Sequence, residues 1–131
     1  MSWKMKAAAS ASMLTLTMSG TLMAAPTAAA AGNCPSGYLC VYDATKFSGN
    51  RIVSASTNSC FDPHAVVANW NYIRSYTNNN SVDAAVWHYS YADFTYKKVR
   101  TLPAGGFSSN IGIDGLGGQY GDKVCMGNAR P

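Results

Sequence analysis

Residues capable of catalysis are few in this chain. All six acidic residues are aspartates, which excludes chemistry that depends on glutamate, such as an HExxH zinc protease or a glycosidase working with two glutamates. Two histidines, His64 and His88, leave room for a Ser-His-Asp arrangement, but no Gly-x-Ser-x-Gly elbow occurs. His88 lies between two aromatic residues in an expected strand, and His64 follows Pro63 in an expected loop. We therefore predict that the protein is not an enzyme.

The other residues with chemistry of their own are four cysteines: Cys34, Cys40, Cys60 and Cys125. An even number in so short a chain predicts two disulfides with three possible pairings. A zinc site is disfavoured, because the sequence has no CxxC or HxxxH pair. If residues 38–43 and 50–55 form a hairpin, the same register continued backwards brings Cys34 opposite Ser59 or Cys60. This argument favours the pairs Cys34–Cys60 and Cys40–Cys125.

The N-terminal thirty residues have the layout of a secretory signal. Lys4 and Lys6 precede an uncharged stretch over residues 7–25, and a run of alanines that offers Ala-x-Ala cleavage sites follows. Serine, threonine and alanine dilute the stretch too much for a membrane anchor. We predict a signal peptide over residues 1–31, one domain over residues 32–131, and a secreted, extracellular protein.

Charge excludes some partners. Charged residues make up 12% of the chain, and without Lys4 and Lys6 of the signal segment the formal net charge falls from +4 to +2, because eight basic residues then face six aspartates. This charge is too small and too scattered for a nucleic-acid footprint. The one basic cluster, Lys97, Lys98 and Arg100, is interpreted as a solvated strand face. We expect no nucleic-acid partner, no membrane and a monomer.

Short β-rich runs broken by turn residues predict an all-β sandwich. The expected strands are 38–42, 51–55, 66–70, 74–77, 84–89, 97–102, 109–113 and 123–126.

An internal repeat organises these strands. Residues 42–49 can be laid over residues 89–96, and both copies read Tyr-x4-Phe; residues 70–75 and 120–125 share an aromatic, polar turn residues and a strand. A period near fifty with four strands per copy predicts two Greek-key motifs packed face to face.

The opening segment CPSGYLCVY at residues 34–42, followed by Phe47-Ser48-Gly49, resembles peptidase inhibitor family I36, whose fold is βγ-crystallin-like. The Tyr-x6-Gly signature of that fold is met by Tyr42 and Gly49, whereas Tyr96 stands where the second copy should have glycine. The resemblance implies a disulfide-stapled βγ-crystallin-like sandwich. It also implies an inhibitor of an extracellular protease, of the thermolysin-like metalloprotease class.

Calcium is a ligand that the resemblance suggests and the residues disfavour. The first candidate segment, residues 71–76, has tyrosine in place of two ligand residues, and in the second, residues 121–126, Cys125 replaces a hydroxyl. We expect no metal and no cofactor, with a weak calcium site using Asn71, Ser75 or Asp122 left open.

The expected inhibitory loop runs from Thr57 to Pro63. Its central residues are Ser59, Cys60, Phe61 and Asp62: Cys60 would tether it, and Phe61 would offer the apolar side chain that a thermolysin-like pocket prefers. The competing interpretation is that Phe61 closes the end of the sandwich. The alternative function is a killer-toxin-like or cell-envelope-binding βγ-crystallin protein without protease inhibition.

Overall fold

The computed structural model describes residues 32–131, so the predicted signal peptide over residues 1–31 lies outside the described part. Within residues 32–131, no helix has the length and apolar character needed to cross a membrane. Nearly all the regular structure is antiparallel strand, which confirms the all-β prediction. The elements are β2 (Leu39–Ala44), β3 (Ser48–Ser54), β4 (Cys60–Phe61), α2 (Pro63–Val66), β5 (Ser75–Asn78), β6 (Ala84–Ser90), β7 (Thr95–Leu102), β8 (Phe107–Ser108) and β9 (Lys123–Met126).

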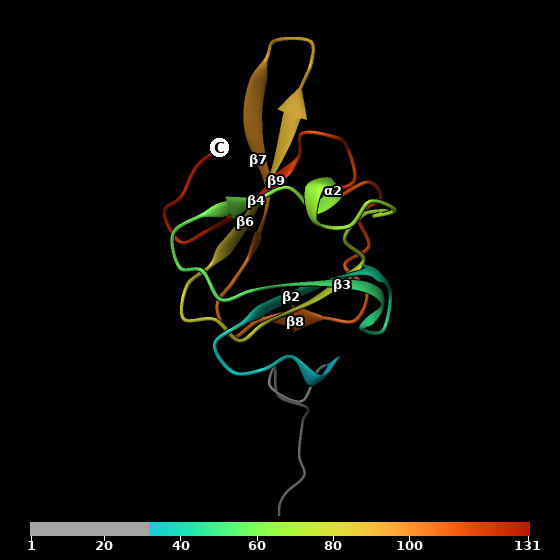
Figure 1. Ribbon diagram of the computed structural model, residues 1–131, viewed down its shortest axis with the longest axis vertical. Coiled ribbons are helices and arrows are strands. Elements are labelled where there is room, and N and C mark those ends of the chain that lie inside the picture. Colours follow the sequence, from blue (N-terminus) through green and yellow to red (C-terminus); the bar gives the residue numbers. More distant parts are fainter. Residues whose placement is uncertain (1–31) are drawn as a thin grey trace, which may run out of the picture.

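Two four-stranded sheets form the sandwich, and the halves of the chain exchange one strand each. The first sheet has the order β3-β2-β5-β8 and the second β4-β9-β6-β7. The late strand β8 thus completes the early sheet, while the early strand β4 joins the late one. Figure 1 shows the two sheets facing one another and the β6–β7 hairpin projecting beyond them. The end of that hairpin lies farther from the two sheets than the other loops drawn in Figure 1.

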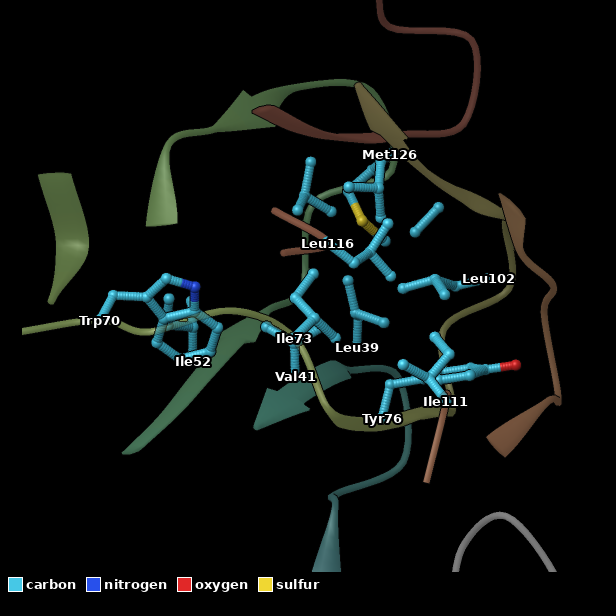
Figure 2. Packing of buried hydrophobic residues seen from close by; sticks show 13 residues of the cluster. Leu39, Val41, Ile52, Trp70, Ile73, Tyr76, Leu102, Ile111, Leu116 and Met126 are labelled. Atoms are coloured by element: carbon cyan, nitrogen blue, oxygen red, sulfur yellow. The ribbon is translucent and has the colours of Figure 1, made fainter. Parts of the chain in front are cut away.

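The core lies between the sheets, and strand alternation determines its members. On β2, Leu39 and Val41 point inward, whereas Cys40 and Tyr42 join a second, smaller cluster on the outer face. Both faces of β2 are therefore covered, which explains its run of four buried residues. Figure 2 shows the main cluster, to which most strands and several loop residues contribute. Its buried members are Leu39, Val41, Ile52, Trp70, Ile73, Tyr76, Ala84, Val86, Leu102, Ile111, Leu116, Val124 and Met126.

Two predicted strands were wrong. The prediction over residues 66–70 fails because Asp62 caps the short helix α2, its side chain accepting a hydrogen bond from the His64 backbone N–H at 2.9 Å. The strand expected over residues 109–113 is irregular backbone, although Ile111 is buried in the core. Asn110 accepts a hydrogen bond from the N–H of Gly112, which has a positive φ of 72°, and this turn interrupts any extended run. Apolar residues alone had suggested both strands.

The predicted disulfide pairing was also wrong, because the chain before β2 turns back. Gly37, at φ 86°, donates its N–H to the carbonyl of Asn79 at 2.9 Å, so the segment leaves the β2–β3 register and crosses towards β5. The Asn79 amide then donates to the Cys34 carbonyl at 2.7 Å. Cys34 consequently bonds to Cys40, six residues away.

The remaining cysteines meet across two strands of the second sheet. Cys60 on β4 lies directly opposite Cys125 on β9, and the two form the second disulfide. The predicted β2–β3 register itself is correct, with Cys40 opposite Val53 and Tyr42 opposite Arg51. Only its backward extension failed, since β4 belongs to the other sheet.

Candidate functional site

The loop expected to inhibit a protease is split by the structure into an exposed half and a packed half. Thr57, Asn58 and Ser59 are exposed, and the Ser59 carbonyl accepts a hydrogen bond from the Met126 N–H at 2.9 Å. The exposed half therefore has a fixed backbone beside the Cys60–Cys125 disulfide.

Phe61 does not point away from the molecule. It lies opposite Val124 in the β4–β9 pair, and residues directly opposite one another share a face of a sheet. Val124 is fully buried in the core, and Phe61 packs against that same cluster. Asp62 is occupied in capping α2 and lies 4.0 Å from the Lys123 ammonium. Phe61 thus has the position expected of a side chain that closes one end of the sandwich.

The first copy of the internal repeat is a hairpin folded tightly against its sheet. Ser75 holds it from β5: its hydroxyl donates to the Ala44 carbonyl at 2.6 Å and accepts from the Phe47 N–H at 3.0 Å. Phe47 packs edge-on against Tyr42, with ring centroids 5.9 Å apart. Gly49, at φ 81°, is required because a Cβ there would meet the Asp43 carboxylate.

The second copy shares one backbone feature with the first, a positive φ at its phenylalanine, but lacks the residues that hold the first copy against its sheet. Phe94, which corresponds to Phe47 in the repeat, has the same φ of 56°. Gly49 is replaced by Tyr96, and Ser75 by Cys125, whose sulfur is bonded to Cys60. Without the glycine and the hydroxyl, the hairpin is not folded over, and Phe94 is 74% exposed. The β6–β7 hairpin, which Figure 1 shows projecting from the sandwich, therefore carries an exposed large apolar side chain near its end.

Hydrogen bonds order the tip of this hairpin. The Asp93 carboxylate accepts from the Thr95 hydroxyl at 2.8 Å and lies 3.4 Å from the Lys97 ammonium. Hydrogen bonds from Thr95, then from Ser90, are the main causes that lower the pKa of Asp93 to about 2, with Lys97 adding to them. Below the tip, Tyr89 packs against Tyr96 and Tyr91 with centroids 4.9 and 4.8 Å away. The residues around the exposed Phe94 are thus ordered by hydrogen bonds at the tip and by tyrosine packing below it.

Both histidines are bound to other parts of the chain. His88 and the Asp122 carboxylate, 3.0 Å apart, line a cavity of about 330 Å³. None of the nine residues lining it is a serine, threonine or cysteine that would act as a nucleophile. The His64 Nε2–H donates to the Gly118 carbonyl at 2.7 Å, and its ring stacks on Tyr120.

The segments considered for calcium are occupied by internal hydrogen bonds. Asp122 is almost wholly buried, and its carboxylate accepts the backbone N–H groups of Tyr89 at 3.1 Å and Gln119 at 3.0 Å as well as contacting His88. Ser75 is used by the first hairpin, and Asn71 is exposed. Within residues 32–131, no three acidic, histidine or cysteine side chains are grouped as a metal site would require.

Comparison with known proteins identifies the family. Peptidase inhibitor family I36 matches residues 27–96, more than half of the chain, and the chain belongs to that family. No curated protein and no solved structure matches it. The match takes in the Cys34–Cys40 disulfide, the first hairpin and the second hairpin as far as Tyr96. The protein is a peptidase inhibitor rather than an enzyme, as predicted.

The exposed hairpin was not singled out from the sequence as a contact surface. The signal was present in the repeat: Tyr96 stands where the first copy has Gly49, and Phe94 stands where it has Phe47. A hairpin without the glycine does not fold back over its sheet, so the aromatic residue that it keeps stays exposed.

Proposed function

We propose that this protein is a secreted inhibitor of an extracellular protease of the thermolysin-like metalloprotease class. Membership of family I36 supports the inhibitory role, and the resemblance of residues 34–49 to metalloprotease inhibitors of that family supports the class of target. The structural observation that carries the proposal is Phe94, a 74% exposed aromatic side chain at the end of the projecting hairpin. It is the apolar group that a thermolysin-like pocket prefers.

The β6–β7 hairpin is suited to enter a cleft without being reorganised. Its strands remain paired up to Ser90 opposite Thr95, and the side chain of Asp93 orders the residues between them. A segment ordered before binding loses less conformational entropy when it binds. The same pairing holds residues 91–94 in a turn. The turn resists the extended backbone conformation that cleavage requires, so the bound segment is cut slowly.

The segment Ser59–Asp62 is the second proposed contact. Its exposed residue Ser59 lies next to the Cys60–Cys125 disulfide, which joins β4 to β9 within the second sheet. In this arrangement Phe61 supports the segment from the core and does not enter the protease. Ser59 would therefore contribute backbone and hydroxyl contacts only.

The test is titration of the protein, with both disulfides formed, against thermolysin, using subtilisin and trypsin as control enzymes. Tight, stoichiometric inhibition of thermolysin alone is expected. Phe94→Ala should weaken inhibition at least tenfold, because a central apolar anchor typically contributes 2 kcal/mol or more, roughly thirtyfold in affinity. Val66→Ala removes another exposed apolar side chain, on α2, and is the matched control.

The variants also separate the two contact segments. If Phe94→Ala inhibits as well as the wild type while Ser59→Gly loses inhibition, the segment Ser59–Asp62 is the contact. Absence of inhibition of all three proteases by folded, oxidised protein would overturn the proposed target class. Growth inhibition of yeast or bacteria by that protein would then favour the killer-toxin-like alternative.

A further inference from the structure

The outer face of the second sheet carries a tryptophan between two lysines. Trp87 on β6 lies directly opposite Lys98 on β7 and directly opposite Lys123 on β9. Residues opposite one another in an antiparallel pair project from the same face. The face is the outer one, because the neighbouring Val86 is buried in the core and successive side chains alternate.

A third cation reaches this tryptophan from the C-terminal segment. The Arg130 guanidinium lies over the Trp87 ring, 5.5 Å from its centroid. Backbone hydrogen bonds position the segment that carries it, since the Gly127 N–H donates to the Asp83 carbonyl at 2.8 Å and the Ala129 N–H to the Met126 carbonyl at 3.2 Å. Lys98 from β7 and Arg130 from the C-terminal segment therefore line the same hollow.

The hollow beside Trp87 has a volume of about 180 Å³ and no acidic wall. The residues lining it are Ala85, Trp87, Lys98, Gly127, Asn128, Ala129 and Arg130. Within residues 32–131, neither Lys98 nor Arg130 takes part in an ion pair, and the nearest carboxylate to Lys123 is Asp62 at 4.0 Å. The two cations that line the hollow, Lys98 and Arg130, therefore lack an ion-pair partner among the described side chains, and such a pair attracts an anion from solution.

Trp87 also has an unused hydrogen-bond donor. Its indole N–H is buried and has no acceptor in the described part of the chain. Buried polar groups are nearly always hydrogen-bonded, so an unpartnered donor is a feature that needs an explanation. An oxyanion in the hollow would bring acceptor atoms next to the ring that carries this donor.

We propose that the hollow formed by Trp87, Lys98 and Arg130 binds a phosphate group. Phosphate offers several oxygens to cations that approach from different directions, and arginine is well suited to bind two of them at once. The volume accommodates one such group, with the remainder of a larger ligand in solvent. The site does not involve Phe94 or Ser59, so the proposal is independent of protease inhibition.

The experiment is a titration of ¹⁵N-labelled protein with inorganic phosphate and with glycerol phosphate, following the Trp87 indole signal assigned through Trp87→Phe. Saturable shifts with millimolar or tighter dissociation constants are expected, and Lys98→Gln and Arg130→Gln should each weaken binding about tenfold. Lys97→Gln is the matched control, because Lys97 pairs with His88 rather than Trp87 and lies on the other face of β7. It should bind as the wild type does.

The two probes identify the source of the phosphate. Tighter binding of glycerol phosphate indicates a phosphate carried by a larger molecule, whereas equal or tighter binding of inorganic phosphate indicates the free ion. Linear, non-saturating shifts, or equal losses in Lys97→Gln and Arg130→Gln, would overturn the proposal. Thermolysin titration of Arg130→Gln is a separate readout and should match the wild type.

Discussion

Phe61 and Val124 lie directly opposite each other where β4 pairs with β9, both on the core side of the second sheet. The neighbouring pair, Cys60 and Cys125, is joined by a disulfide on the opposite face. One short strand therefore has a covalent attachment on one side and an apolar attachment on the other. This arrangement makes the segment before α2 a structural support of the sandwich.

Phe61→Ala should lower the free energy of unfolding by about 2 kcal/mol, less than the 3–5 kcal/mol typical of a fully buried phenylalanine because Phe61 is half-buried. Urea unfolding followed by circular dichroism measures the change. Asn58→Ala, in the exposed half of the same loop, should change stability by less than about 0.5 kcal/mol. Wild-type stability in Phe61→Ala would contradict the packing described for this side chain.

Gly49→Ala should destabilise the protein by about 2 kcal/mol. The backbone at Gly49 has φ 81°, and an added Cβ would displace the Asp43 carboxylate, which accepts the Asn50 N–H at 2.7 Å. Thermal unfolding would measure the loss. Gly105→Ala is the informative comparison, because Gly105 has a similar φ of 78° but open space around it, and should cost less.

Thr95→Val should raise the pKa of Asp93 from about 2 towards its ordinary value of 3.8, because the Thr95 hydroxyl is the main group holding that pKa down. A carboxyl whose pKa falls on folding stabilises the folded state above its unfolded pKa, and this stabilisation disappears as the pH falls through its folded pKa. In the wild type the Asp93 carboxylate should therefore keep its hydrogen bonds at pH 4 and lose them as the pH falls towards 2. NMR titration of the Asp93 carboxyl tests this, with Thr101→Val on the same strand as control.

The two disulfides should contribute unequally. In the loop-entropy description, the bond with a sequence separation of 6 contributes about 2 kcal/mol and the bond with a separation of 65 about 4 kcal/mol. Double serine variants of each pair, compared by urea unfolding, measure the difference. A larger loss for Cys34→Ser/Cys40→Ser than for Cys60→Ser/Cys125→Ser would contradict the entropic ranking.

Alternating apolar residues and turn signals were sufficient to predict the sandwich and most of its strands. The hairpin of β2 and β3 has the predicted pairing, Tyr42 opposite Arg51, because Ile52 on β3 must face the core and a shift of that strand by one residue would turn it outward. The strand expected at residues 66–70 failed where a local capping interaction of Asp62 outweighed an apolar pattern.

Long-range pairing could not be obtained from the same patterns. The disulfide prediction assumed that the β2–β3 register continued to Cys34 and Cys60, but the turn at Gly37 and the transfer of β4 to the second sheet end it. Both depend on contacts with Asn79 and with β9, which are distant in sequence. The inward direction of Phe61 follows from that same transfer, whereas the exposure of Phe94 follows from two substitutions already visible in the repeat.

The separation of the two disulfides also sets the order in which they are able to form during synthesis. Cys34 and Cys40 enclose a very short loop, and the contacts that place them together extend only as far as Asn79, so their bond needs no residue of the second sheet. Cys60 must wait until Cys125, six residues before Pro131, has been made. A chain interrupted between residues 80 and 124 would therefore carry a closed N-terminal ring and an incomplete second sheet, with β4 not bonded to β9 and a free thiol at Cys60.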